Sequence, residues 1–110
     1  MPLGGEAKAR AFYSGLLGIP EFPKPAELAG RGGCWFVDGA LKLHLGVEPD
    51  FRPSSKVHCA FIVEDLPALT TKLRQAGFEI RSGEAFDGHA RVYIADPFGN
   101  RIELMEPAKA

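Results

Sequence analysis

Apolar residues recur at the spacing of a helix in two segments of the chain. The first helical face consists of Ala9, Phe12, Tyr13 and Leu16. Gly18 is placed to end this helix, because glycine adopts the left-handed conformation at helix C-termini at little cost. The second helical face consists of Leu66, Leu69, Leu73 and Ala76, which are expected to point inward and be buried. Asp65 precedes it as a predicted N-cap, and Gly77 follows it as a predicted stop.

Segments rich in apolar residues surround both helices and predict β-strands. In the second half of the chain these segments are residues 57–63 before the helix and 78–81, 91–95 and 101–105 after it. In the first half they are residues 19–22, 33–37 and 41–45, all after the helix. Residues 96–100 contain Pro, Gly and Asn and predict the hairpin turn between the last two strands.

The second half therefore has the order β-α-β-β-β, and the first half has the same order with its first strand missing. Only five residues precede Glu6, and two of them are glycine. The sequence predicts a first module at about 1–50, a linker at 50–56 and a second module at about 57–107. At 110 residues, the chain is expected to be a single α+β domain made of these two modules.

The composition of the chain argues against nucleic acid and membranes as binding partners. The net charge of -1 and the pI near 6.3 give no basic surface for nucleic acid. No apolar stretch approaches the ~18 residues of a membrane helix, and the start of the chain lacks the pattern of a signal peptide. We therefore expect a cytoplasmic protein that binds neither nucleic acid nor membrane. Cys34 and Cys59 form no CxxC pair and are expected to be buried packing residues.

Three stretches carry a family resemblance: residues 9–18, with an aromatic pair before Leu-Gly; residues 58–66; and residues 96–104, Asp-Pro-Phe-Gly-Asn-Arg-Ile-Glu-Leu. They resemble the vicinal-oxygen-chelate superfamily of glyoxalases, bleomycin-resistance proteins and extradiol dioxygenases. The resemblance implies paired βαβββ modules that form a cup-shaped sheet. The superfamily hosts many activities, so the resemblance leaves the chemistry open.

The resemblance also implies metal ligands on the first and last strands of each module. In the second module these positions hold His58 and Glu103. In the first module the direct alignment gives Lys42, whereas a shift of two residues gives His44; chemistry favours His44, because a protonated lysine does not bind metal. The fourth ligand would lie on the missing strand. His44, His58 and Glu103 would suit a divalent Fe, Mn, Zn or Ni ion with positions open to substrate oxygens.

Alternation along the strands predicts the residues that line the cup. Ile102 and Leu104 should face the helix, so Arg101, Glu103 and Met105 should face the cup. Trp35 and Phe36 lie on opposite faces of one strand, so one packs in the core and the other reaches the cavity; Phe36 is the predicted cavity residue. The predicted substrate-binding residues are Arg91, Tyr93, Phe36, Met105 and, on a loop at the rim, His89. Each of these residues also has an ordinary interpretation as a surface or packing residue.

Three functions remain open. The first is metal-assisted lyase, isomerase or dioxygenase chemistry on a small oxygen-bearing substrate, with Glu103 as the candidate catalytic base. The second is metal-free binding and sequestration of a small molecule, as in bleomycin-resistance proteins. The third is a structural dimer that has lost its site. The missing strand would leave an unpaired strand edge, and a second copy of the chain could cover it, so a homodimer is predicted.

Overall fold

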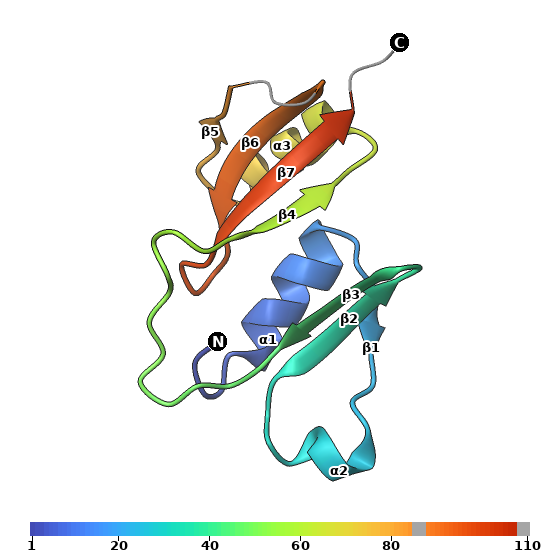
Figure 1. Cartoon of the computed structure of the whole chain (residues 1–110), viewed down its shortest axis with the longest axis vertical. Coiled ribbons are helices and arrows are strands. Elements are labelled where there is room, and N and C mark those ends of the chain that lie inside the picture. Colours follow the sequence, from blue (N-terminus) through green and yellow to red (C-terminus); the bar gives the residue numbers. More distant parts are fainter. Residues whose placement is uncertain (85–87, 108–110) are drawn as a thin grey trace. The chain divides into compact units, whose positions relative to one another are not determined.

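The computed structural model describes residues 1–84 and 88–107 (Figure 1). These residues form a mixed α+β fold with two sheets. It divides into two compact units, Met1–Arg52 and Pro53–Ala110, and the division falls within the predicted linker. Among the described residues, none of the helices has the length and apolar character needed to cross a membrane.

The first unit begins with a helix and continues into an antiparallel sheet. Segment α1 (Glu6–Ala9) runs directly into the π-helical segment η1 (Arg10–Leu16). The sheet has the order β1-β2-β3, from β1 (Glu21–Phe22), β2 (Cys34–Asp38) and β3 (Leu41–Leu45). A short helix, α2 (Ala26–Ala29), interrupts the Pro-rich and Gly-rich connector, where the sequence predicted no element.

The first helix confirms the predicted segment but not its pitch. The N–H of Leu17 donates to the carbonyl oxygen of Phe12, five residues earlier, at 2.9 Å. Such wide turns are π-helical, and the periodicity of apolar side chains does not distinguish them from α-helical turns. The helix ends before Gly18, whose φ of 77° explains the choice of glycine there.

Gly33 ties this helix to β2. Its φ is +82°, and a Cβ at this position would lie 2.1 Å from the carbonyl oxygen of Leu45, so only glycine fits. The N–H of Gly33 donates to the Glu6 carboxylate at 2.8 Å. This hydrogen bond lowers the pKa of Glu6, because it favours the ionised form.

No labelled strand precedes α1 among the described residues, but the backbone of Met1 takes a strand-like position. Its terminal nitrogen donates to the carbonyl oxygen of Gly46 at 2.8 Å, and its own carbonyl oxygen accepts from the N–H of Glu48 at 3.0 Å. The two bonds on either side of Val47 have the pattern of a parallel strand pair.

The second unit has the complete β-α-β-β-β order that its sequence predicts. Its elements are β4 (Cys59–Ile62), α3 (Leu66–Gln75), β5 (Arg81–Ser82), β6 (His89–Ala95) and β7 (Arg101–Pro107). The sheet order is β4-β7-β6-β5, in which β4 runs parallel to β7 and the other pairs are antiparallel. Helix α3 lies on one side of this sheet (Figure 1).

Helix α3 is capped twice at its start. The Asp65 carboxylate accepts from the N–H of Ala68 at 3.1 Å, as the sequence predicts. The Glu106 carboxylate on β7 accepts from the N–H of Leu66 at 3.2 Å, which the sequence pattern did not indicate. Two predictions about buried residues are wrong: Ala76 is exposed at the helix end, and Cys59 is exposed near the start of an edge strand, whereas Cys34 is buried.

The turn between β6 and β7 is organised by Asp96. One of its carboxylate oxygens accepts from the N–H groups of Phe98 and Asn100, at 2.9 and 2.8 Å. The other accepts from the Asn100 side-chain amide at 2.8 Å. The side chain is buried and fully engaged, so it sets where β7 begins and hence the register of Arg101 and Glu103.

Candidate functional site

The face of the second sheet opposite helix α3 carries several polar side chains. On β7, Ile102 and Leu104 are buried towards α3, so Glu103 lies on the opposite face. Tyr93 on β6 is the direct cross-strand neighbour of Glu103, and Arg91 is that of Met105. We call this surface, with Arg91, Tyr93, Arg101, Glu103 and Met105, the open face.

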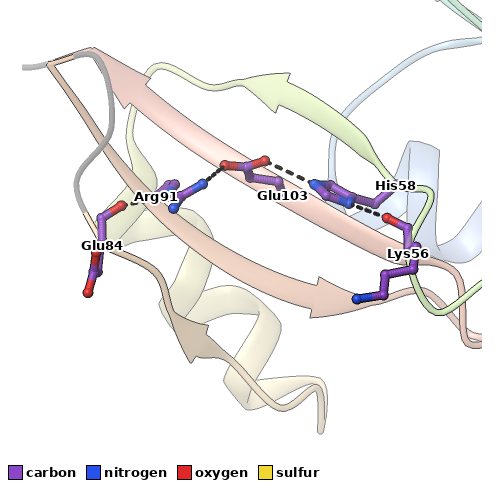
Figure 2. A network of polar contacts seen from close by, with 5 residues as sticks. All are labelled: Lys56, His58, Glu84, Arg91 and Glu103. Carbon is purple, nitrogen blue, oxygen red and sulfur yellow. Dashed lines mark hydrogen bonds and ion pairs between the residues drawn. The ribbon is translucent and has the colours of Figure 1, made fainter.

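Glu103 is the centre of a polar network on the open face (Figure 2). One carboxylate oxygen accepts from Nη1 of Arg91 at 2.9 Å, and the other lies 3.3 Å from Nε2 of His58. Arg91 is held in turn, because its Nε donates to the carbonyl oxygen of Glu84 at 2.5 Å. Glu103 is only 7% exposed, so this carboxylate is largely removed from water and depends on its two partners.

The network lowers the pKa of Glu103. The hydrogen bond from Arg91 is the main cause; burial opposes it, and the contact with His58 adds to it. Glu103 is therefore ionised at neutral pH. An ionised carboxylate is a good metal ligand and hydrogen-bond acceptor. The role of Glu103 as catalytic base stays a prediction.

His58 is oriented by a backbone group. Its Nδ1 lies 3.1 Å from the carbonyl oxygen of Lys56, which can only accept, so Nδ1 donates and Nε2 turns towards Glu103 (Figure 2). A histidine that binds a metal commonly has its second nitrogen fixed in this way. The ring of Tyr93 meets the His58 ring edge to face, with centroids 5.9 Å apart.

His58 and Glu103 fit a divalent metal as two of its ligands. Two donor atoms that each lie about 2.0–2.2 Å from one ion are themselves roughly 3 Å apart, and Nε2 of His58 lies 3.3 Å from the Glu103 oxygen. Arg91 holds the second oxygen of Glu103, which leaves one oxygen for an ion. Within the part of the chain that the structure describes, no group of three His, Cys, Asp or Glu side chains is arranged to hold a metal.

His44 lies in the first unit, exposed on β3. Its ring stacks on Trp35, with centroids 3.8 Å apart and planes 4° from parallel. Lys42 is two residues away on the same face of the strand. The choice between Lys42 and His44 as a ligand, and the joining of His44 to His58 and Glu103, stay predictions.

Two predicted binding residues require correction. Phe36 is completely buried, and the centroid of its ring lies 5.6 Å from that of Tyr13 on the helix, so Phe36 is a core residue. Trp35 points to the opposite face of β2. The open side of β2 therefore carries the tryptophan that the prediction assigned to the core. His89 is not on a loop but is the first residue of β6, where it shares the face of Arg91 and Tyr93.

Arg101 lies on the face that alternation predicts, but it was not among the predicted binding residues. Its guanidinium carbon lies 4.3 Å from the centroid of the Tyr93 ring, and that of Arg91 lies 5.4 Å from it. Alternation along β7 gave the signal, since Arg101 is two residues before Glu103. The sequence also did not predict that Lys56 and Glu84 take part in the Glu103 network. They do so through backbone carbonyl groups, which side-chain patterns do not show.

Comparison with known proteins places this fold in a family. A model of the Glyoxalase/Bleomycin resistance protein/Dioxygenase superfamily matches residues 6–104. A search of curated proteins gave no significant match. A glyoxalase family protein from Bacillus anthracis is 45% identical, with 97% of this chain and 88% of that chain covered and a TM-score of 0.91.

Two less similar structures share the fold. TnmS3, an antibiotic binding protein from Streptomyces sp. CB03234, is 20% identical, with 98% and 91% of the two chains covered and a TM-score of 0.75. FosX, a fosfomycin resistance protein from Listeria monocytogenes, is 15% identical, with 98% and 88% covered and a TM-score of 0.75. Because the family model spans nearly the whole chain, the protein belongs to the Glyoxalase/Bleomycin resistance protein/Dioxygenase superfamily.

Proposed function

We propose that the protein acts on a small oxygen-bearing molecule with the help of a divalent metal held by His58 and Glu103. The observation that carries this proposal is the pairing of Nε2 of His58 with a Glu103 oxygen at 3.3 Å, with Nδ1 of His58 already fixed by the Lys56 carbonyl. Imidazole and carboxylate together suit Fe, Mn, Zn or Ni. When bound, such an ion supplies Lewis-acid polarisation of a substrate oxygen.

The chain's own residues prepare the site. Arg91 fixes the orientation of the Glu103 carboxylate and keeps it ionised. The ring of Tyr93 packs edge to face beside the His58 ring. Met105, next to Glu103 on the same face, offers an apolar contact for the body of a substrate. Met105, Tyr93, Arg91 and His89 therefore remain the proposed substrate contacts.

Metal content tests the proposal directly. Protein purified without chelators and then supplied with Fe, Mn, Zn or Ni should bind about one equivalent by elemental analysis, and His58→Ala should lose most of it. His89→Ala is the matched control, because it removes a histidine from β6, in the same sheet but two strands away from β4, and should retain the metal. Equal, near-zero metal in the parent and in His58→Ala would overturn the metal-assisted function.

That same result would favour a second function, metal-free binding of a small molecule. Arg91 supports this alternative, because its guanidinium already neutralises Glu103 and holds one of its oxygens at 2.9 Å. A permanent cation at that carboxylate weakens its attraction for a metal ion. The fold is shared with an antibiotic binding protein, so sequestration is within the range of this architecture.

We also propose a cytoplasmic homodimer. The edge position of β4 in its sheet supports self-association, because Ile62 on this strand and Val57 just before it are largely exposed, at 69% and 78%. Light scattering at micromolar concentration should give about twice the chain mass of 11.9 kDa. A well-folded monomer would contradict the dimer and leave the metal proposal untouched.

A further inference from the structure

A hollow of about 410 Å³ lies beside the Glu103 network, at the end of the sheet where β6 turns into β7. Its lining consists of Ser55, Glu79, Arg81, Tyr93, Ile94, Ala95 and Arg101. Tyr93 belongs both to this hollow and to the open face, so the two are adjacent. The volume lies within the range of pockets that bind small molecules.

Two arginines from different strands converge on this hollow. Arg81 on β5 is the direct cross-strand neighbour of Tyr93, and Arg101 on β7 is that of Ala95, so the two guanidinium groups flank the β6 segment between them. The guanidinium carbon of Arg101 lies over the Tyr93 ring, 4.3 Å from its centroid. Such a cation–π contact holds the guanidinium in place, and its N–H groups can still bind an oxyanion.

The positive charges of the two arginines exceed the negative charge of the side chains that line the hollow. The carboxylate of Glu79 lies 3.5 Å from Nε of Arg81, but both side chains are 78% exposed, so this pair is weak. None of the described residues forms an ion pair with Arg101. Two guanidinium groups against one carboxylate leave the hollow with a net positive charge.

Hydrogen bonds and packing hold the segment that forms the rim of the hollow. The Ser54 hydroxyl accepts from the N–H groups of Lys56 and Val57, at 3.2 and 3.1 Å, which fixes the turn that carries Ser55. Pro53 packs close to Gly99 in the β6–β7 turn, where an added Cβ would lie 3.1 Å from the Pro53 ring. Ser55, which lines the hollow, thus belongs to a segment that is held on both sides.

We propose that this hollow binds the oxyanion group, carboxylate or phosphate, of the small molecule on which the protein acts. The guanidinium groups of Arg81 and Arg101 would hold the anion, and the Ser55 hydroxyl would donate to it. The rest of the molecule then extends past Tyr93 towards Glu103 and His58. The inference rests on the proposed function, because it names the substrate class of the same face.

Amide NMR on metal-free protein tests this proposal, with inorganic phosphate and benzoate titrated separately at constant ionic strength. Both probes carry an oxyanion, and the one that binds more tightly identifies the preferred group. Saturable shifts are expected at Ser55, Arg81, Ala95 and Arg101. Arg101→Met and Arg81→Met should each weaken binding at least about fivefold, as the loss of a charge-assisted hydrogen bond implies.

The matched control is Arg74→Met, which removes an exposed arginine from α3 and should leave binding unchanged. Absence of saturation with both probes, or equal affinity in the parent, Arg81→Met and Arg101→Met, would overturn the inference. Metal content is also measured on the parent protein, on Arg81→Met and on Arg101→Met. Metal binding without anion binding defeats only this inference, whereas anion binding without metal defeats only the metal-assisted function.

Discussion

The two units are built on one plan but present different chemistry. Each packs a helix against one side of a sheet and leaves alternate side chains on the other side. In the first unit those side chains include the stacked pair of Trp35 and His44. In the second unit they include a buried carboxylate between an arginine and a histidine. The repeated apolar pattern therefore determines the sheets, and the few residues between the apolar positions determine what each unit can bind.

The turns that end the two sheets differ in the same way. In the second unit the buried Asp96 carboxylate holds the turn with three hydrogen bonds. In the first unit, Asp38 and Gly39 connect β2 to β3 and are exposed. A rigid turn keeps Glu103 in register with Tyr93, whereas the first unit has no buried polar group on its sheet that needs such precision.

The largest expected effect concerns the helix-facing row of β7. Leu104 is completely buried against α3, so Leu104→Ala should lower the free energy of unfolding by roughly 2–5 kcal/mol. Met105→Ala, on the partly exposed open face, should lower it less. Urea denaturation of both variants measures the difference. If Met105→Ala proved the more damaging substitution, the assignment of faces along β7, and with it the place of Glu103, would be wrong.

A smaller loss of stability is expected when the turn between β6 and β7 is altered, and almost none when the turn between β2 and β3 is altered. Asp96→Ala leaves two backbone N–H groups and the Asn100 amide without their acceptor and should lower the free energy of unfolding by about 1–3 kcal/mol. Asp38→Ala, at an exposed position, should change it by less than about 0.5 kcal/mol. Thermal unfolding of the two variants compares them. Equal losses would show that the Asp96 network contributes nothing beyond an ordinary turn.

The smallest effect is a pH dependence at Glu103. The folded-state pKa of Glu103 is lowered, so its stabilisation is complete above the usual value of about 4.3 and is lost as the pH falls through the folded pKa. Arg91→Met removes the main cause of the shift. The Tm of the parent should therefore exceed that of Arg91→Met at pH 7, and the gap should narrow as the medium is made more acidic than about pH 4. A gap that stays constant with pH would show that Arg91 stabilises by packing alone.

Periodicity predicted most of the fold and the direction of most side chains. Residues 41–45 and the two β7 faces were confirmed, because alternation in a half-buried strand leaves little freedom. Phe36 and His89 show where this fails. Trp35 and Phe36 are both large and aromatic, so composition alone could not decide which one is buried. His89 follows a glycine in a polar segment, and only its pairing with Pro107 makes it part of β6.

The network around Glu103 could be predicted only in part. His58 and Glu103 followed from the family resemblance, and Arg91 followed from alternation. The backbone carbonyls of Lys56 and Glu84 could not be foreseen, because every residue carries one and only the folded chain determines which is near a donor. The ionised state of Glu103 likewise depends on distances rather than on residue types.

The central claim is that the chemistry of this chain depends on one carboxylate, Glu103, held ionised by Arg91 and His58. An NMR titration of the Glu103 side-chain carboxyl carbon in metal-free protein tests this claim most directly. We expect a pKa below the usual range of glutamate, and a clear rise in that pKa in Arg91→Met, because the hydrogen bond from Arg91 is the largest cause of the shift. A pKa in the usual range or above it, unchanged by Arg91→Met, would contradict the account.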